Sequence, residues 1–331
     1  MPADKSIDVI IPARGTVPWL TIALHSLAAQ TLQPAWITII DDGLESPSTV
    51  HDLGAQLFGT RFQFLKNPGR GISAALNAAV KQSHAYWIAR MDADDVAHSH
   101  RLEQQLNVLI AHSPDVLGCG TQVRFINAAG KPLGHSRLFT SWEEIVGRLR
   151  SQTCFIHSSL MIRREALMAT PYRPSLDGAE DVDLVLRLSQ KGRIINLDDA
   201  LLDYRIHLTQ ESFRMRARHT AVQELAFRLA ECRQETSRDP LENNPHLAET
   251  FVRWRLSTPG YIRARTALTA LRYARTYLCG RDIQGFFQCA QIALKFLPIT
   301  PASFRIVWGV YRHAGAALLD SKTPFEALNN R

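Results

Sequence analysis

Three carboxylates lie within four residues in the segment Arg90-Met91-Asp92-Ala93-Asp94-Asp95, directly after the apolar run 85–89. Like charges at this spacing repel each other, and a divalent cation is the usual reason for a fold to gather them. Mg²⁺ and Mn²⁺ prefer oxygen ligands and are commonly held by one or two carboxylates together with substrate phosphates. We therefore expect a metal–diphosphate site at the carboxyl end of a buried strand. The alternative is an acidic turn in which Asp95 caps the following helix.

The elements that must position these carboxylates follow from the hydrophobic pattern. Up to about residue 120, short apolar runs alternate with amphipathic stretches, which predicts βαβ units on a parallel sheet. The predicted strands span residues 7–11, 36–40, 62–65 and 86–91, with Pro12 ending the first. The predicted helices span residues 18–30, 49–58, 72–82 and 100–112.

Polar residues follow each of the four predicted strands. They are Pro12-Ala13-Arg14, Asp41-Asp42-Gly43, Asn67-Pro68-Gly69-Arg70-Gly71 and Asp92–Asp95. Ligands of open parallel sheets bind beyond the carboxyl ends of the strands, so we expect these groups to meet at one edge. The glycine-permitted amides of residues 67–71, next to a helix start, are a plausible phosphate neighbourhood.

The second half of the chain has a different pattern. Residues 121–140 read as a polar excursion with a hairpin turn near 128–131. Strands are predicted at residues 158–162, 193–196 and 201–204, and a helix at 181–190. From about residue 212 the pattern is almost entirely helical, with breaks at Asp239-Pro240 and Asn244-Pro245, so we expect a boundary within residues 210–250.

Composition bounds the class of protein. The chain has 331 residues and a net charge of +7, and residues 251–331 hold 12 Lys and Arg against 3 Asp and Glu. This basic final quarter suggests a polyanionic neighbour, either an anionic membrane surface or nucleic acid. The five cysteines lack zinc-site spacing and suit a reducing compartment. Without a signal-peptide pattern or an apolar run of transmembrane length, a cytoplasmic protein is expected.

The order of the motifs resembles glycosyltransferase family 2, whose members have the GT-A nucleotide-sugar fold. It is similar to the bacterial hexosyltransferases that build cell-surface polysaccharide and lipopolysaccharide. The resemblance covers about residues 5–212. Its motifs are Val9-Ile10-Ile11-Pro12, Ile39-Ile40-Asp41-Asp42-Gly43, Asn67-Pro68-Gly69, Ala75-Leu76-Asn77, Arg90–Asp95, Arg101-Leu102-Glu103-Gln104-Gln105, Gly178–Leu184 and Tyr204-Arg205-Ile206-His207.

The resemblance implies an α/β fold with a Rossmann-like, mostly parallel sheet flanked by helices, and an α-helical C-terminal region. Residues 1–212 are then the catalytic domain, with a nucleotide-sugar half at about 1–120 and an acceptor half at about 121–212. Residues 213–331 form a basic helical region that could associate with a membrane.

The resemblance also implies roles for individual residues on the nucleotide side. Asp41 and Asp42 are expected to contact the base and ribose, as carboxylates accept imide N–H and hydroxyl groups. The alternative is a turn with Gly43 at positive φ. The full set of residues expected to bind the nucleotide sugar is Pro12, Arg14, Asp41, Asp42, Asn67, Gly71, Asn77, Asp92 and Ala93. The family often has Arg just before Asn77, where this chain has Leu76, and Arg70 or Arg14 could substitute.

Asp92-Ala93-Asp94 resembles the Asp-x-Asp motif of the family, which implies Mn²⁺ or Mg²⁺ as cofactor. Strand-like alternation places Asp92 and Asp94 on one side. Asp94 is expected to ligate the cation, with His207 as a second metal ligand implied by the resemblance. The cation would offset charge on the departing nucleoside diphosphate. The histidines at 98 and 100 could suggest zinc, but three carboxylates favour an oxygen-preferring metal.

Glu180 and Asp181 resemble the base motif of the family. An inverting transfer needs a base for the proton of the acceptor hydroxyl, and we assign that role to Asp181, with Glu180 in support. The alternative is that these acids only favour a helix N-terminus. His157 lies where the family lines its acceptor site. Asp183 is expected to face away, and Arg187 to form an ion pair or stay exposed.

The expected activity is transfer of a sugar from a nucleotide-diphosphate donor, most plausibly a UDP-sugar, to a glycan or lipid-linked acceptor. In the basic quarter, Tyr261–Leu278 interleaves arginines with apolar residues, residues 286–297 are strongly apolar, and aromatic and aliphatic residues follow at 304–311. Such helices suit an anionic membrane surface, with peripheral association at the inner face of the cytoplasmic membrane, or a packed helical subdomain. No nucleic acid is expected.

Two other function classes fit parts of the sequence. A sugar-phosphate nucleotidylyltransferase shares the sheet architecture, but it needs a Gly-rich basic signature directly after the first strand, where this chain has Pro12–Pro18. A non-enzymatic, basic nucleic-acid-binding protein would place its charge in the tail, but the interleaved apolar residues there fit a packed or membrane-facing helix better.

Overall fold

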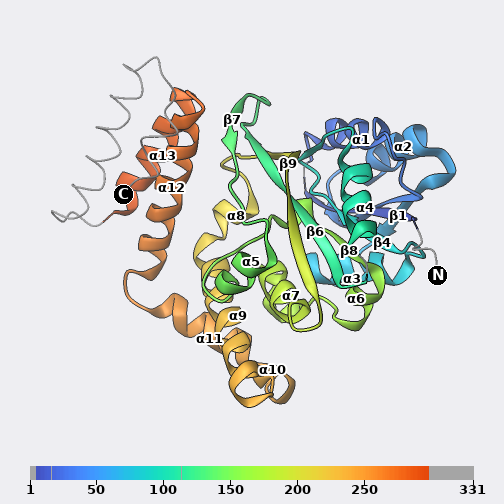
Figure 1. Ribbon diagram of the computed structural model, residues 1–331. Coiled ribbons are helices and arrows are strands. Elements are labelled where there is room, and N and C mark those ends of the chain that lie inside the picture. Colours follow the sequence, from blue (N-terminus) through green and yellow to red (C-terminus); the bar gives the residue numbers. More distant parts are fainter. Residues whose placement is uncertain (1–4, 16, 113, 298–331) are drawn as a thin grey trace. The chain divides into compact units, whose positions relative to one another are not determined.

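The computed structural model describes residues 5–15, 17–112 and 114–297, and its course is traced in Figure 1. Two compact units are built from interleaved stretches of the chain. The first, the sheet unit, comprises the described residues up to Arg124, His135–Arg205 and Val222–Ala248. The second, the helical unit, comprises Phe125–Gly134, Ile206–Ala221 and the described residues from Glu249 to Leu297. The division predicted near residue 212, between a catalytic domain and a basic helical region, stays a prediction.

One mixed sheet dominates the described part of the chain, with strand order β3-β2-β1-β4-β8-β6-β9-β5 and β7 paired to β6. Its strands are β1 (Ile7–Gly15), β2 (Trp36–Leu44), β3 (Phe62–Lys66), β4 (Trp87–Arg90), β5 (Val96–Ala97), β6 (Val116–Ile126), β7 (Pro132–His135), β8 (Met161–Arg163) and β9 (Arg193–Arg205). Strand β1 pairs in parallel with β2 and β4, and β2 with β3. The pairs β4–β8, β6–β8 and β5–β9 are antiparallel. The α/β fold is confirmed, but the expectation of a mostly parallel sheet is wrong, because these three antiparallel pairs, which involve β8, β6, β9 and β5, make the sheet a mixed one.

The helices of the sheet unit connect these strands. They are α1 (Leu20–Ala28), α2 (Pro47–Phe58), α3 (Ile72–Gln82), α4 (Arg101–Ala111), α5 (Trp142–Arg148), α6 (Arg164–Ala169), α7 (Glu180–Leu188) and α10 (Pro240–Asn243), with 3₁₀ turns at Gly59–Arg61, His157–Ser159 and Pro174–Leu176. Helix α3 packs on β1 and β2, and α7 packs on β9. The helices predicted within the first 112 residues are all present.

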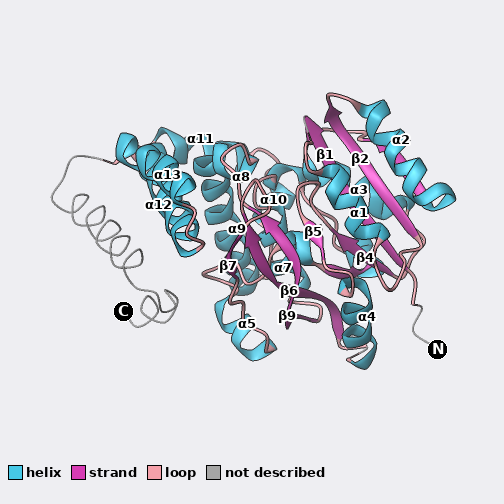
Figure 2. Cartoon of the chain, turned by 90° about the horizontal axis from the view of Figure 1, so that it is seen from above, coloured by secondary structure: helices cyan, strands magenta, loops and turns pink. Residues whose placement is uncertain are grey.

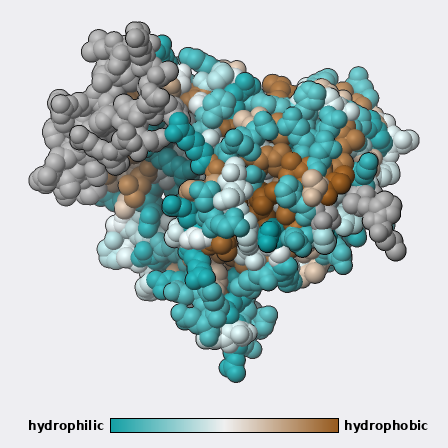
Figure 3. All heavy atoms as spheres, viewed as in Figure 1, coloured by the Kyte–Doolittle hydropathy of each residue, from teal (hydrophilic) through white to brown (hydrophobic). Residues whose placement is uncertain are grey.

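The core lies between the parallel strands and these helices. Ile10, Ile11, Ile39 and Ile40 are each at most 1 % exposed, as expected for parallel strands that are covered on both faces. On the face drawn in Figure 3, hydrophilic side chains cover most of the described surface and apolar ones gather in patches between them. The apolar runs of the sequence therefore form the interior that holds the strand ends in place.

The expectation that Pro12 ends the first strand is wrong, because β1 continues to Gly15. The Ile10 carbonyl accepts a hydrogen bond from Met91 N–H at the end of β4, and the last β1–β4 pair is Ile10 with Arg90. Backbone groups of alternate residues point to the same side of a strand, so Pro12 faces the side where β4 has already ended. Its missing N–H therefore costs no ladder hydrogen bond.

Three further predictions need correction. Residues 121–126 are part of the long strand β6 rather than a polar excursion. The buried Gln122 satisfies its amide there, donating to the Leu138 carbonyl at 2.9 Å. The two strands predicted in residues 193–204 are one strand, β9, and the turn-like Asp198 and Asp199 lie within it, exposed. The 3₁₀ turn at His157–Ser159 replaces the start of the strand predicted at residue 158.

The helical unit contains α8 (Glu211–Arg214), the start of α9 (Arg216–Thr236), most of α11 (Leu247–Ser257), and α12 (Tyr261–Cys279) and α13 (Ile283–Phe296). Helices α12 and α13 lie side by side (Figure 2). Asp282 caps α13 by accepting from Gly285 N–H at 3.0 Å. Among the described residues, no helix combines the length and the apolar character needed to cross a bilayer. The apolar stretch predicted at residues 304–311 lies outside the described residues.

Candidate active site

Three carboxylates meet where β4 ends. Strand β4 is entirely buried, and the chain turns directly after it. Ligand oxygens of Asp92, Asp94 and Asp95 lie within 4.8 Å of one another. The strand-like alternation expected for Asp92 and Asp94 is wrong, since Ala93 and Asp94 form a turn, and this turn adds Asp95 to the group. An all-oxygen donor set of this kind fits Mg²⁺ or Mn²⁺.

Asp95 is a buried anchor of this cluster and does not cap a helix. It is 1 % exposed and accepts hydrogen bonds from the Ser158 hydroxyl and from the backbone N–H of Arg205, the latter at 2.9 Å. The N-cap position of α4 is taken by His100 instead. The helix-cap interpretation of Asp95 is therefore wrong, because the strand pair β5–β9 separates it from α4.

Asp92 is held by Arg90, a buried residue to which the sequence analysis gave no role. The two Arg90 Nη atoms bond both carboxylate oxygens of Asp92, with Nη1–Oδ2 at 2.8 Å. Burial raises the pKa of Asp92 to about 6, with Arg90 opposing the rise and Asp94 adding to it. Arg90 also interacts electrostatically with Glu180, at the start of α7.

Asp94 is half-exposed in the turn. Its backbone carbonyl accepts a hydrogen bond from Arg205 Nε at 2.8 Å. Arg205 in turn stacks over the Trp19 ring, with Cζ 5.2 Å from the ring centroid. Arg205 belongs to the quoted motif around residues 204–207, and that membership was the only signal for it in the sequence. Arg205, at the end of β9, thus stabilises the turn that contains Asp94.

The predicted base residues begin α7. Glu180 is buried and its Oε2 accepts from Gly178 N–H at 2.8 Å, while Asp181 is half-exposed. Burial raises the pKa of Asp181, repulsion from Glu180 adds to the rise, and His157 opposes it. A carboxylate with a raised pKa binds a proton more readily, which is the property a general base needs.

His157 lies beside these acids, and its predicted place at an acceptor site stays a prediction. Its Nδ1 is 3.5 Å from Glu180 Oε1, and its Nε2 is 3.0 Å from the Tyr172 hydroxyl. Burial, together with the nearby positive charge of Arg90, lowers the pKa of His157 to about 3. The imidazole is therefore neutral at physiological pH, and it orders Glu180 without adding a charge.

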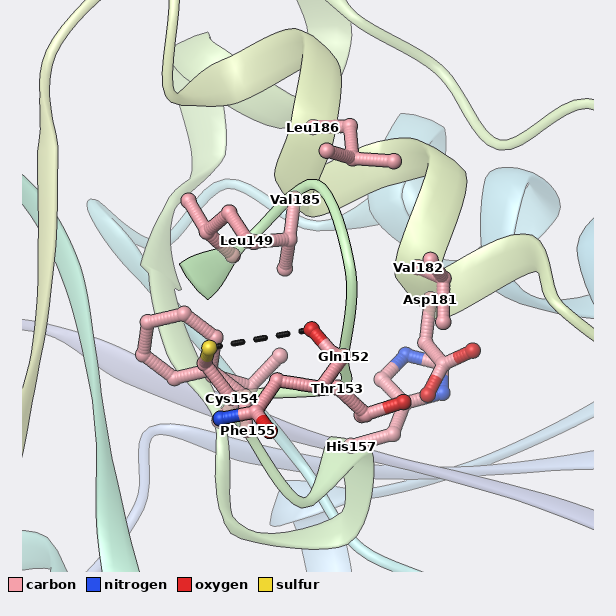
Figure 4. A pocket seen from close by; sticks show the side chains of 11 residues that line it. Leu149, Gln152, Thr153, Cys154, Phe155, His157, Asp181, Val182, Val185 and Leu186 are labelled. Atoms are coloured by element: carbon pink, nitrogen blue, oxygen red, sulfur yellow. Dashed lines mark hydrogen bonds between the residues drawn. The ribbon is translucent and has the colours of Figure 1, made fainter. Parts of the chain in front are cut away.

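A small apolar pocket opens next to Asp181 (Figure 4). Its apolar lining is Leu149, Phe155, Leu160, Val182, Val185 and Leu186, and the polar atoms of His157, Asp181, Gln152, Thr153 and Cys154 complete it. The Cys154 thiol contacts the Gln152 carbonyl at 3.7 Å. The predicted base thus lies at the boundary between a polar cluster and an apolar surface.

On the nucleotide side, Asp41 and Gly43 lie in the last residues of β2 rather than after it, and Asp41 makes a local side-chain turn there. Its Oδ1 accepts from Gly43 N–H at 2.9 Å and from Leu44 N–H at 2.7 Å. Gly43 has φ +103°, a conformation that glycine adopts at little cost. A carboxylate has two oxygens and can keep this turn while accepting from a ligand.

Asp42, Asn67 and Gly71 are bonded to one another. Asp42 Oδ1 accepts from Asn67 Nδ2 at 2.5 Å and from Gly71 N–H at 3.2 Å. Asn67 also accepts from Gly69 N–H at 3.1 Å. The amides of this loop thus donate to protein oxygens, and phosphate binding by them stays a prediction that requires these bonds to be exchanged.

Asn77 is half-buried, and its side chain bonds the segment before α7. Its Nδ2 donates to the Tyr172 carbonyl at 2.8 Å, and its Oδ1 accepts from Tyr172 N–H at 2.9 Å. The neighbouring Leu76 is completely buried. The site therefore uses Asn77 to hold the segment before α7, and its predicted contact with the nucleotide stays untested.

The remaining predicted residues lie as follows. Pro12 is half-buried and Arg14 exposed near the end of β1, and Ala93 is half-exposed between two cluster acids. His207 belongs to the helical unit, where its Nδ1 is 2.7 Å from the Thr209 hydroxyl. Its role as a metal ligand stays a prediction. His98 Nε2 lies 2.7 Å from Asp203 Oδ1, and His98 is not part of the acidic cluster.

Comparison with known proteins supports these assignments at the level of family and fold. The model of the family "Glycosyl transferase family 2" matches residues 8–170. The chain is 30 % identical over 209 residues to the O-antigen biosynthesis glycosyltransferase WbnJ of Escherichia coli, covering 61 % of this chain and 80 % of that protein.

Two solved structures share the fold. S. aureus TarS 1–349, solved with UDP, has a TM-score of 0.51 at 16 % identity and covers 89 % of this chain and 93 % of its own. The mannosyltransferase PcManGT from Pyrobaculum calidifontis, solved with GDP-Man and Mn²⁺, has the same score and identity and covers 96 % and 88 %. The chain therefore belongs to glycosyltransferase family 2 and is a GT-A glycosyltransferase similar to the bacterial enzymes of polysaccharide biosynthesis.

Proposed function

We propose that this enzyme transfers a sugar from a nucleoside-diphosphate donor, with UDP-sugars the first choice, to a hydroxyl of a cell-surface glycan or lipid-linked acceptor. The observation that carries the proposal is the group of ligand oxygens of Asp92, Asp94 and Asp95 at the end of β4. Arg90 bonds Asp92, and its guanidinium interacts electrostatically with Glu180 of the predicted base pair. The cluster suits a cation and diphosphate, and the pair suits an acceptor hydroxyl. A UDP-bound and a GDP-Man-bound neighbour support both nucleotide classes.

The metal dependence rests on the chemistry of the cluster. Asp92, Asp94 and Asp95 supply oxygen donors, and the adjacent Arg90 and Arg205 do not cancel three carboxylates. A bound Mn²⁺ or Mg²⁺ would act as a Lewis acid toward the leaving diphosphate. Asp95 orients Asp92 through Ser158, whose hydroxyl donates to Asp95 and accepts from Asp92 N–H at 3.0 Å.

The chain's own residues account for the acceptor side. Asp181 would remove the proton from the acceptor hydroxyl as its oxygen attacks the anomeric carbon from the face opposite the diphosphate, which inverts the configuration. Glu180 and the neutral His157 hold the start of α7 in place through their mutual contact. The apolar wall of the pocket beside Asp181 gives this base an apolar surface on one side.

Calorimetric titration of UDP into the protein tests the proposal. We expect binding with Mn²⁺ that is lost in EDTA and in Asp94→Ala, and retained in Asp198→Ala, a matched control because Asp198 is an exposed carboxylate in β9. Equal binding in Mn²⁺ and EDTA would contradict the metal dependence. If GDP binds and UDP does not, the nucleotide assignment changes and the reaction class stays.

A second proposal concerns the helical unit, in which α12 presents Arg263, Arg272 and Arg275 to solvent with Ile262 and Leu268, each about half exposed. We propose that these residues contact an anionic membrane surface near a lipid-linked acceptor. Co-sedimentation with phosphatidylglycerol vesicles but not with phosphatidylcholine vesicles is expected, with release at high salt. Retention on heparin or DNA without vesicle binding would favour the nucleic-acid alternative, and no binding to either would favour a packed subdomain.

A further inference from the structure

The segment Tyr172–Asp177 joins two parts of the site that lie far apart in the sequence. It runs through the 3₁₀ turn Pro174–Leu176 and ends directly before Gly178, at the start of the α7 motif. Helix α3, which follows the loop 67–71, contacts this turn. The geometry of the segment therefore relates the start of α3 to the start of α7.

Asp177 takes the place of a cap on α3. The N-cap residue of α3 is Gly71, which has no side chain to cap the helix. The backbone N–H of Ser73, two residues after the N-cap, donates to Asp177 Oδ1 at 3.1 Å across a sequence separation of 104 residues. A carboxylate at this position satisfies a free helix N–H and interacts favourably with the helix dipole.

The fit between Asp177 and Gly71 is close. A Cβ atom added at Gly71 would lie 1.9 Å from Asp177 Oδ2, and Gly71 has φ +81°. Gly71 therefore both adopts a conformation that other residues avoid and leaves the space that the carboxylate fills. The same glycine N–H donates to Asp42, so the two carboxylates approach the first turn of α3 together.

A second attachment lies about one turn further along α3, at Asn77. Asn77 exchanges two hydrogen bonds with the backbone of Tyr172, and the Tyr172 hydroxyl contacts His157 beside Glu180. The segment is thus fixed to α3 at both of its ends. Gly178 follows at once, and its N–H donates to Glu180.

The electrostatic surroundings of Asp177 agree with this placement. Burial raises the pKa of the Asp177 carboxyl, and repulsion from both Glu180 and Asp42 adds to the rise. Asp177 therefore lies within electrostatic range of one acid on the nucleotide side and one on the base side. The repulsion from these two acids disfavours the Asp177 carboxylate, and the hydrogen bond from Ser73 N–H offsets part of this cost.

We propose that Asp177 is a positioning residue, which fixes the start of α7, with Glu180 and Asp181, relative to the start of α3 and its loop 67–71. This inference rests on the proposed function, in which α7 carries the catalytic base and the enzyme binds a sugar donor. A base displaced by about 1 Å can lose about a hundredfold in rate, so this role appears in kcat rather than in the binding of the sugar donor.

Steady-state kinetics of Asp177→Ala and Asp177→Asn test the role. We expect kcat for sugar transfer to fall about 10- to 100-fold in Asp177→Ala, with the KM for the sugar donor within about threefold of wild type. Asp177→Asn, whose Oδ1 still accepts from Ser73, should keep most of the rate. A kcat within twofold of wild type in Asp177→Ala overturns the proposal, as does an equal loss in both variants.

Ser141→Ala is the matched control, because Ser141 caps α5 by accepting from Glu144 N–H at 3.3 Å and lies in no part of the site. Its kcat should equal that of wild type although it also loses a helix cap. If Asp177→Ala does not fold, Asp177→Ser takes its place.

Hydrogen exchange of the full chain decides the proposal without any activity. Asp177→Ala should exchange faster both at residues 72–75 and at residues 178–184, while Ser141→Ala should change only the start of α5. Faster exchange at residues 72–75 alone would overturn the proposal. A wild-type chain that transfers no sugar from any nucleotide donor contradicts the proposed function instead, and the exchange result still decides the role of Asp177.

Discussion

Asn77 and the backbone of Tyr172 exchange two hydrogen bonds, at 2.8 and 2.9 Å, across 95 residues of sequence. A single asparagine in α3 thereby holds the peptide that leads to the predicted base. The side-chain amide offers one donor and one acceptor side, which match the carbonyl and the N–H of one residue. This use differs from the nucleotide contact predicted for Asn77.

Replacing Asn77 by Ala should therefore destabilise the fold more than it weakens nucleotide binding. It leaves the Tyr172 carbonyl and N–H without their partner, which costs about 1–3 kcal/mol for each such buried group. Urea unfolding should show the lower stability, and calorimetry should give a dissociation constant for UDP close to that of wild type. A large loss of UDP affinity at unchanged stability would instead restore the nucleotide contact.

Replacing Asp181 by Asn should remove transfer while leaving the sugar donor bound. General-base catalysis contributes about 10²–10⁴-fold, and Asn keeps the size of the side chain without its basicity. Single-turnover transfer and UDP titration on the same sample separate the two effects. Turnover near the wild-type rate would exclude Asp181 as the base.

The pH dependence of kcat should report the contact between Asp181 and Glu180. The pKa of Asp181 is raised above 3.8. On acidification, Asp181 therefore becomes protonated, and activity is lost, at a higher pH than with an ordinary aspartate as the base. Glu180→Gln removes the repulsion that contributes to this rise. The acidic limb of the pH profile should then move to lower pH, whereas an unmoved limb would show that another group controls it.

A buried ion cluster supports α7 from its other face and predicts a strong stability effect. Asp183 is completely buried, bonds Arg173, and pairs with Arg187 at 2.9 Å. Arg173 also pairs with Asp239 at 2.6 Å, and Arg233 pairs with the same Asp239 at 3.0 Å. The expectation that Asp183 faces away from the site agrees with this position, and the ion pair expected for Arg187 is present.

Asp183→Ala would leave the surrounding arginines buried without this partner, a change that costs about 3–5 kcal/mol. We expect a clearly lower midpoint in thermal or urea unfolding, against no change in Asp198→Ala. A midpoint within one degree of wild type would show that the arginines find other partners. Because Arg233 and Asp239 lie beyond residue 212, a chain cut there should also lose part of this support.

The comparison of sequence with structure is clearest at the four strand ends. The apolar runs and the short helices between them predict a parallel sheet, and the structure contains it as β1 to β4. This part is predictable because hydrophobic periodicity is a local property of the sequence. The acidic cluster after β4 is equally local, since its three carboxylates lie within four residues. Family resemblance through ordered motifs then gave the fold and the class of reaction.

Long-range contacts were beyond such reasoning. Arg90 and Arg205 were quoted within motifs, but their bonds to Asp92 and to the Asp94 carbonyl depend on a turn and on the end of β9. The length of β9 and of β6 was misjudged because polar residues within a strand look like turns until cross-strand partners satisfy them.

The sequence by itself determined the type of chemistry, because residue types such as Asp92, Asp94 and Asp181 and their order along the chain carry it. The tertiary structure decided which of the candidate side chains face a ligand and which hold the protein together. Asn77 and Asp177 show why: the first was expected to bind nucleotide and the second was not singled out, yet both bond residues about a hundred positions away. Only the packed fold brings such pairs within hydrogen-bond distance, and no local pattern in the chain encodes that distance.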